Sequence, residues 1–274
     1  MNIMITGSSG FIGRHLVRRL SKGHSLFTPD REFFSSASDH QLQATLVEKK
    51  IEVVIHLASY FVRFHTVEDI APMRESNVVL GSRILKAMEG VPSAWFINTG
   101  SAYENSGPHH DQPWNLYAET KTEFQNILSL SKVPHVTLKL FETYGPGDTR
   151  DKVLSIIHKN AVKKLPMEMS PGKQRLEMTY IDDVVSSYVR TLELLSGGKI
   201  NKGIFGVPGE RVSLHGLVEK YELATGNKTD IRWGALPYRP NEIMEPWSDF
   251  RTLPGFSPRV SLEEGIRKTF AADS

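Results

Sequence analysis

Short runs of apolar residues alternate with segments of helical periodicity through the first half of the chain. Residues 2–6 and 53–57 are such runs, and the second, VVIHL, is typical of a strand buried on both faces. Residues 11–20 carry apolar side chains at helical spacing. This alternation indicates an α/β fold in which helices cover both faces of a parallel sheet. The same pattern predicts further strands at 25–28, 95–98 and 136–141, and helices at 39–49, 73–88 and 117–131.

The pattern becomes less regular after residues 144–147. Helical segments follow at 153–164 and 181–195, and residues 231–257 are rich in proline and aromatic residues. We therefore expect two parts. The first spans residues 1–145, with 176–200 returning to it, and a smaller lobe is built from 146–175 and 201–274.

The composition is that of an ordinary globular protein, with 39% hydrophobic and 23% charged residues. The 33 basic and 31 acidic residues give a formal net charge of +2, so nucleic acid is not an expected partner. The absence of cysteine excludes disulfides, cysteine nucleophiles and thiolate metal sites. No run reaches the ~18 apolar residues of a membrane span, and residues 1–20 lack a signal-peptide pattern. We expect a cytoplasmic protein without a membrane partner.

A glycine-rich turn joins the first predicted strand to the first predicted helix. Its glycines are spaced GxxGxxG. The first two allow a tight turn close to a pyrophosphate, and the third lets the helix pack near the sheet. N–H groups at a helix N-terminus also favour phosphate. In this context the turn predicts dinucleotide binding rather than a plain strand–helix connection. The predicted cofactor-binding residues are Gly7, Ser8, Ser9, Gly10, Phe11, Ile12 and Gly13.

The choice between the two nicotinamide cofactors depends on the end of the second predicted strand. Asp30 is placed to accept a hydrogen bond from a ribose 2′-hydroxyl, which favours NAD. Arg31 is placed to pair with a 2′-phosphate, which favours NADP. We favour NADP(H), and NAD(H) remains open.

Tyr117 and Lys121 stand at positions i and i+4 and share one face of a predicted helix. The ammonium, with a positively charged nicotinamide, is expected to lower the pKa of the phenol from about 10. The phenol then exchanges a proton with a substrate oxygen while hydride moves at the same carbon. Lys121 is also placed to bond the nicotinamide ribose. Thr99 or Ser101, at a predicted strand end, offers a hydroxyl to the same oxygen.

Together these features resemble an extended short-chain dehydrogenase/reductase. More narrowly, they resemble the NAD-dependent epimerase/dehydratase family that acts on nucleotide sugars. Asn77 and the run Tyr144-Gly145-Pro146 belong to the same pattern, and the resemblance continues through residues 175–183 and 238–240. It implies a Rossmann-type doubly wound sheet and a smaller C-terminal lobe that binds substrate. It also implies a catalytic triad of Thr99, Tyr117 and Lys121, and cofactor contacts from Leu57, Ala58 and Ser59.

Two positions after Thr99 depart from several members of that family. Sugar 4,6-dehydratases carry the acid and base for water loss where this chain has Gly100 and Ser101. The epimerase-reductases of the family carry a cysteine at the second position. The chain therefore retains hydride transfer at a sugar C4, by a 4-ketoreductase or a 4-epimerase. Its length and residues 138–146 most resemble the CDP-sugar 4-ketoreductases of the paratose and abequose synthase type, in O-antigen deoxysugar biosynthesis. A non-catalytic dinucleotide sensor is the alternative from another class.

The resemblance also implies which residues hold a nucleotide-diphosphate sugar. Arg175 and Arg239 match positions that bind the diphosphate. Ser101, Glu142 and Thr143 are further substrate-binding candidates, although the family usually has asparagine where Glu142 stands.

We expect no metal site and a homodimer. His109 and His110 have only one carboxylate nearby in the sequence. The family resemblance implies a four-helix interface built from residues 73–88 and 117–131. Their apolar residues could instead cover the sheet alone, since any such helix needs one apolar face. These residues are Val78, Ile84, Leu85 and Met88, and Phe124, Ile127, Leu128 and Leu130.

Overall fold

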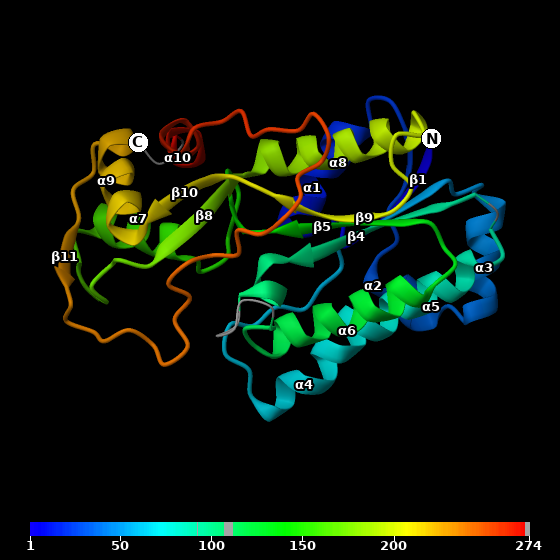
Figure 1. Cartoon of the computed structure of the whole chain (residues 1–274), viewed down its shortest axis with the longest axis horizontal. Helices are drawn as coiled ribbons and strands as arrows, with labels where there is room; N and C mark the ends of the chain where they lie inside the picture. The colour runs from blue at the N-terminus through cyan, green and yellow to red at the C-terminus, as the bar shows by residue number, and fades with distance from the viewer. Residues whose placement is uncertain (92, 107–111, 272–274) are drawn as a thin grey trace.

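The computed structural model describes residues 1–91, 93–106 and 112–271. Its centre is a six-stranded sheet in the order β2-β1-β3-β4-β5-β9, in which every neighbouring pair is parallel (Figure 1). This confirms the predicted doubly wound parallel sheet. The strands are β1 (Asn2–Thr6), β2 (Ser25–Phe27), β3 (Val53–His56), β4 (Trp95–Ser101), β5 (His135–Leu140) and β9 (Gly203–Val207).

The strand order reverses beside β1. From β1 the chain moves outward to β2, and then returns to place β3 on the other side of β1. The connections that leave the carboxyl ends of β1 and β3 therefore diverge. Ligands of open α/β sheets bind in the crevice that such a reversal opens. The glycine turn lies at this place, between β1 and α1 (Phe11–Leu20).

Alternating side chains of the strands belong to two separate hydrophobic cores. Ile3 and Ile5 of β1 join one core and Met4 joins the other, as the two-residue period of a strand requires. Helices α1 and α8 (Ile181–Ser196) cover the first face. The second face is covered by α3 (Asp39–Glu48), α5 (Leu80–Met88) and α6 (Leu116–Leu130) (Figure 1).

One predicted helix is longer and less regular than the sequence pattern indicated. The segment predicted at 73–88 begins earlier, as α4 (Val67–Arg74), and reaches α5 through a π-helical segment, η1 (Glu75–Val79). Because Pro72 lies inside α4, the sequence pattern did not predict that the helix begins earlier. The wider π turn shifts the helical period, and such insertions are frequent at functional sites. A short helix α2 (Arg31–Ser36), which we did not predict, follows β2.

A second group of elements lies at the end of the sheet toward which β4 and β5 point (Figure 1). It holds a three-stranded sheet, β10-β8-β6, and a two-stranded sheet, β11-β7. Strand β9, within the range 201–274, pairs with β5 in the central sheet instead. No helix in the described part of the chain is long and apolar enough to cross a membrane. The elements of this group are β6 (Glu142–Tyr144), α7 (Val153–Lys163), β7 (Pro166–Met169), β8 (Arg175–Tyr180), β10 (Glu210–Ser213), α9 (Leu214–Thr225), β11 (Asp230–Trp233) and α10 (Leu262–Phe270).

Candidate active site

The glycine turn is compact because two of its glycines leave no room for a side chain. Gly7 has a φ of +68°, and a Cβ there would lie 2.7 Å from the backbone nitrogen of Ala58. A Cβ on Gly13 would lie 2.2 Å from the carbonyl oxygen of Gly7. The start of α1 is thereby held against the end of β1, and the end of β3 lies directly beside the turn.

The N-terminus of α1 has the features of a phosphate cradle. Its N-cap is Gly10, which has no side chain to cap the helix, and the first turn carries no acidic residue. The predicted residues Ser8, Ser9, Phe11 and Ile12 surround this helix start. Unpaired N–H groups and the helix dipole together favour an anionic group at such an end. The turn therefore fits the pyrophosphate of a dinucleotide.

Three cationic or polar side chains join this cradle to the segment after β6. Arg14 donates hydrogen bonds to the carbonyl oxygens of Ser9 and Gly147, each 3.1 Å long. His15 Nε2 lies 3.1 Å from the carbonyl oxygen of Pro146. The guanidinium of Arg150 lies 4.6 Å from the ring centre of Phe11. The sequence analysis missed Arg150, whose position depends on contacts far along the chain.

The predicted segment 57–59 is fixed between the glycine turn and α6. The Thr6 hydroxyl accepts hydrogen bonds from the N–H groups of Leu57 and Ala58, at 3.2 and 3.1 Å. Ser59 donates its hydroxyl proton to Asn77 Oδ1 at 3.1 Å. Asn77, in the π-helical segment, donates in turn to the Thr120 hydroxyl of α6 at 2.9 Å. Asn77 therefore links the loop after β3 to the helix that carries Tyr117 and Lys121.

The two residues weighed for cofactor choice have different surroundings. Asp30 is the N-cap of α2, and its carboxylate accepts a hydrogen bond of 2.9 Å from the N–H of Phe33. Arg31 is the first residue of that helix, and its side chain is exposed. Asp30 thus has a structural partner, whereas the guanidinium of Arg31 faces solvent at the carboxyl end of β2.

Tyr117 and Lys121 lie one turn apart on α6, with the phenol half-buried and the lysine 2% exposed. Burial raises the pKa of Tyr117 to about 12, although hydrogen bonding to Ser59 lowers it in part. Burial also lowers the pKa of Lys121 to about 8. We expected the pKa of the tyrosine to be lowered. The chain's own groups raise it instead, because the loss of solvation outweighs the neighbouring charges.

The two candidate hydroxyls of β4 have different partners. Thr99 Oγ1 lies 2.7 Å from the phenol oxygen of Tyr188, a fully buried residue of α8. Ser101 accepts a hydrogen bond of 3.2 Å from the N–H of Tyr103 and caps the short 3₁₀ helix η2 (Ala102–Asn105). Strand β4 therefore brings Thr99 against α8, while α6 packs on the other face of the same strand. Nothing in the local sequence pointed to Tyr188.

A buried ion pair fills the space beside Gly100. Glu104 accepts a hydrogen bond of 2.6 Å from the N–H of Ser101, and Lys139 Nζ lies 3.1 Å from its other carboxylate oxygen. A Cβ on Gly100 would lie 2.7 Å from Glu104 Oε1. This carboxylate raises the pKa of both Tyr117 and Lys121. The sequence analysis missed Glu104, which has two fixed structural partners.

Glu142 is held by partners on both sides. Its carboxylate accepts hydrogen bonds from the phenol of Tyr103 and, at 2.8 Å, from Lys152 Nζ. Burial alone would raise the pKa of Glu142, but Lys152 and the Tyr103 hydroxyl outweigh burial and bring it to about 2. Glu142 is therefore a carboxylate at neutral pH. The hydroxyl of Thr143 accepts a hydrogen bond of 3.1 Å from Arg150.

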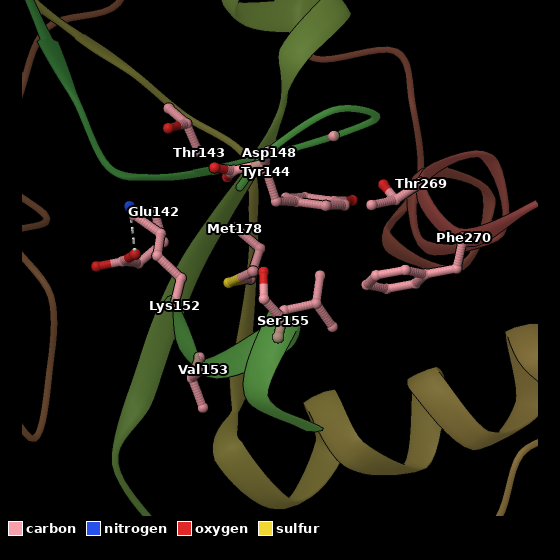
Figure 2. A pocket seen from close by; sticks show the side chains of 12 residues that line it. Glu142, Thr143, Tyr144, Asp148, Lys152, Val153, Ser155, Met178, Thr269 and Phe270 are labelled. Atoms are coloured by element: carbon pink, nitrogen blue, oxygen red, sulfur yellow. Dashed lines mark hydrogen bonds and ion pairs between the residues drawn. The ribbon is translucent and has the colours of Figure 1, made fainter. Parts of the chain in front are cut away.

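Glu142 and Thr143 also line a narrow cavity between β6, α7 and α10. Figure 2 shows Lys152 and Glu142 joined by their ion pair on one wall, with Thr269 and Phe270 of α10 opposite. None of the three predicted catalytic residues lines this cavity. It therefore reaches the predicted substrate residues and not the proton-transfer group.

The two predicted diphosphate-binding arginines contact different segments. Arg175, at the start of β8, has a side chain 45% exposed and lies 3.9 Å from a carboxylate oxygen of Glu245. The guanidinium of Arg239 lies 5.2 Å from the ring centre of Phe64, and that of Arg63 lies 5.8 Å from the same ring. The structure thus groups Arg239 with Arg63, which we did not predict, rather than with Arg175.

Most of the apolar residues that we assigned to a dimer interface are buried within the protomer. Six of the eight are buried, and all of these except Val78 belong to the core beneath α5 and α6, so the alternative that these stripes cover the sheet describes them better. Two remain exposed: Ile127 is 37% and Leu130 is 87% accessible. The buried ones are Val78, Ile84, Leu85, Met88, Phe124 and Leu128.

No metal-binding group of three or more His, Asp or Glu side chains occurs among the described residues. His109 and His110 lie outside the described ranges. The main chemical features of the site are the cradle at α1 and the pair Tyr117 and Lys121 on α6.

The model of the NAD dependent epimerase/dehydratase family matches residues 3–204. A CDP-abequose synthase from Salmonella muenchen is 28% identical over 287 residues, covering 97% of this chain and 96% of the relative. A UDP-glucuronic acid 4-epimerase structure from Bacillus cereus superposes with a TM-score of 0.84 at 24% identity, covering 99% of this chain and 98% of that one. A UDP-glucose 4-epimerase structure from Thermus thermophilus gives 0.79 at 22% identity, with the same coverage of each chain.

The two structural matches extend over nearly the whole chain and agree with the Rossmann-type sheet described above. The family match covers the glycine turn, the end of β4 and the helix with Tyr117 and Lys121. The resemblance identified from the sequence is thereby confirmed. The chain belongs to the NAD-dependent epimerase/dehydratase family.

Proposed function

We propose that the protein is a 4-ketoreductase that uses NADPH to reduce a nucleotide-linked 4-keto-6-deoxysugar at C4. The observation that carries this proposal is the protonation state of Tyr117. Burial keeps its pKa at about 12, so the phenol is a proton donor at neutral pH. A ketone that receives a hydride needs one proton on its oxygen, and a protonated phenol can deliver it.

Each member of the predicted triad then has one task. Tyr117 donates its proton to the C4 oxygen, and Thr99 orients that oxygen through its hydroxyl. Lys121 holds the ribose, and its charge favours the phenolate that remains after proton transfer. When bound at the glycine turn, the reduced nicotinamide supplies the hydride. The turn residues and segment 57–59 hold the cofactor.

The surroundings of β4 support reduction over dehydration. Water loss needs an additional acid–base pair, and the matching positions hold Gly100 and Ser101. The nearby carboxylate of Glu104 is held by Lys139 and the N–H of Ser101, so both of its oxygens have partners. A side chain on Gly100 would collide with that carboxylate. The site therefore favours a reaction that needs one proton donor.

A nucleotide-sugar 4-epimerase is the second candidate. The family and the named activities of the structural relatives favour it, since both solved relatives cited above are 4-epimerases. The CDP-abequose synthase relative favours the reductase. A non-catalytic dinucleotide sensor is disfavoured by the buried lysine beside Tyr117, because binding alone does not need a proton relay.

Cofactor stoichiometry separates the two enzyme candidates. We expect a 4-keto-6-deoxy nucleotide sugar to consume one equivalent of reduced cofactor and to give a 4-hydroxy product. In heavy water, no deuterium should enter C3 or C5 beyond the background exchange of the ketone. Conversion of a 4-hydroxy sugar into its C4 epimer without net cofactor change would favour the epimerase. Enzyme-dependent deuterium at C3 or C5 would reveal an acid–base residue outside the proposed triad.

The proposed preference for NADPH depends on Arg31. Asp30 already caps α2, and its neighbour Arg31 is an exposed cation at the carboxyl end of β2. We expect Arg31→Ala to lower the affinity for NADPH by about tenfold or more, the worth of a charge-assisted hydrogen bond. The affinity for NADH should fall much less. Fluorescence titration with both cofactors measures this. The exposed Lys22, in the turn before β2, gives the control variant Lys22→Ala. Equal losses for the two cofactors would assign the position to Asp30 and NAD.

The substrate is proposed to lie between the central sheet and the second group of elements, which holds the β10-β8-β6 sheet. Ser101 of β4, and Glu142 and Thr143 of β6, are the proposed sugar contacts. Arg175 and Arg239 are the proposed contacts for the diphosphate. A carboxylate at Glu142 is a better neighbour for a neutral sugar than for a uronic acid, because like charges repel. The ionised state of Glu142 therefore supports a neutral sugar over a uronic acid.

A homodimer also remains a proposal. The exposed apolar residues Val79 and Ile127, at 39% and 37%, and Leu130, at 87%, lie on η1 and α6. They offer the outer face of the two segments that we expected to form the interface. Sedimentation equilibrium at micromolar protein distinguishes this dimer from a monomer.

A further inference from the structure

A buried hydrogen bond links the two helical layers through the end of β4. Thr99 Oγ1 and Tyr188 Oη lie 2.7 Å apart, although the residues are 89 positions apart in the chain. Tyr188 is fully buried, and Thr99 is 8% exposed. Tyr188 belongs to α8, on the face of the sheet opposite α6. The contact therefore holds the Thr99 side chain from the α8 face of the sheet.

This hydrogen bond satisfies both buried hydroxyls. Buried polar groups almost always have a hydrogen-bond partner. Thr99 is the one hydrogen-bond partner of the Tyr188 hydroxyl within the described part of the chain. The neighbouring hydroxyls of Ser187 and Thr191 donate to backbone carbonyls of their own helix. Among the described residues Thr99 Oγ1 likewise has Tyr188 as its one partner, so either hydroxyl can supply the shared proton, and the bond fixes the position of both oxygens.

The bond holds the Thr99 hydroxyl in one place near the carboxyl end of β4. Burial raises the pKa of Tyr188, so the phenol stays neutral across the working pH range. Ionisation of Tyr117 would raise that pKa further, which shows that the two phenols lie within electrostatic range. The Thr99 hydroxyl is thus held by a neutral phenol of α8.

We propose that Tyr188 is a positioning residue: its phenol fixes the place of the Thr99 hydroxyl, so that this hydroxyl can meet the substrate oxygen. This inference rests on the proposed function, in which Thr99 orients the C4 oxygen. Tyr188 does not touch the substrate. Its contribution is a pre-set orientation of the hydroxyl, and a small misplacement at a reacting centre costs rate rather than binding.

The test removes one oxygen atom. Tyr188→Phe keeps the ring and its packing and deletes the hydroxyl. We expect kcat to fall about five- to tenfold, the usual worth of one hydrogen bond, while KM for the sugar and the affinity for cofactor change less than twofold. A purely structural role would lower the melting temperature without this split between kcat and KM.

A double-mutant cycle gives the sharper readout. In Thr99→Val the hydroxyl that Tyr188 positions is absent, so adding Tyr188→Phe should cause no further loss of kcat. Tyr221→Phe is the matched control, because Tyr221 is also fully buried and its phenol oxygen lies 3.0 Å from His158 Nδ1. This control should leave kcat unchanged both in the wild type and in Thr99→Val.

The outcomes separate this inference from the proposed function. If Thr99→Val keeps full activity, the proposed role of Thr99 is wrong, and the positioning role is overturned with it. If Thr99→Val loses activity but Tyr188→Phe matches the wild type, the positioning role alone is overturned. Equal proportional losses from Tyr188→Phe in both backgrounds would also overturn it. The same cycle applies to epimerase turnover if that is the activity found.

Discussion

Replacing Tyr117 by phenylalanine is expected to lower turnover by about two to four orders of magnitude, the usual contribution of a positioned acid–base group. The change deletes only the phenolic oxygen. Phe61, whose ring packs edge-on against Tyr117 with centres 4.8 Å apart, keeps its partner. The glycine turn is untouched, so cofactor affinity should remain close to that of the wild type.

Single-turnover reduction with bound cofactor measures this effect most directly, because it separates the chemical step from release of product. Tyr221→Phe is again the control, since it removes a buried phenolic oxygen on α9. A Tyr117→Phe enzyme that retains most of its turnover would exclude Tyr117 as the proton donor. A large loss of cofactor affinity would instead indicate that the variant disturbs the fold of α6.

The pKa of Tyr117 also predicts how the rate of reduction depends on pH. With a pKa of about 12, the phenol stays protonated between about pH 6 and 10. Reduction should therefore not fall in this range through loss of the Tyr117 proton. A basic limb centred near pH 8 would report Lys121, whose pKa lies at about 8. Lys121→Met should abolish such a limb.

The parts of the site that the sequence predicted correctly are encoded locally. The spacing of Gly7, Gly10 and Gly13 demands a tight turn wherever a strand meets a helix, and the structure forms that turn. Tyr117 and Lys121 share a helix face because four residues make about one turn. These short-range relations do not depend on how the rest of the chain folds.

The parts that the sequence could not predict are contacts between distant segments. Tyr188 reaches Thr99 from a helix 89 positions away, and Arg150 reaches Phe11 only after the segment following β6 folds back on α1. The apolar stripe of α6 has the same pattern whether it covers the sheet or a second protomer. Only the folded sheet shows that Phe124 and Leu128 of this stripe belong to the core of the protomer.

The pKa of Tyr117 could not be predicted from the sequence for a similar reason. The expected lowering of the Tyr117 pKa considered the nearby charges but not the loss of water around the phenol. The structure raises that pKa, with burial as the largest contribution. Glu104 contributes too, from a short 3₁₀ helix whose direction no local pattern specifies.

Lys121→Met is expected to have two opposite effects: turnover falls by about two orders of magnitude or more, and the folded protein becomes more stable. Lys121 is 2% exposed, and no oxygen among the described residues accepts a hydrogen bond from its ammonium. Its pKa is lowered from 10.5 to about 8 by burial. At about 1.4 kcal/mol for each tenfold change in proton affinity, this corresponds to about 3 kcal/mol of destabilisation at neutral pH.

The dependence on pH follows from proton linkage. The unfolded state holds its proton up to about pH 10.5 and the folded state only to about pH 8. Between these values the unfolded state binds more protons, so raising the pH stabilises the wild type relative to its unfolded state. The advantage of Lys121→Met should therefore be largest below about pH 8 and vanish above about pH 10.5.

Urea unfolding of the cofactor-free protein at pH 7 and pH 9.5 measures both statements. Lys139→Met is the matched control, because Lys139 is another buried lysine, 6% exposed, but one with partners: it lies 3.1 Å from Glu104 Oε2 and donates to Asn105 at 2.6 Å. Removing one member of a buried ion pair destabilises by about 3–5 kcal/mol. The two substitutions should therefore shift stability in opposite directions. A destabilised Lys121→Met at pH 7 would show that the ammonium has a satisfied site in the folded chain. The destabilisation assigned to the buried charge of Lys121 would then be wrong.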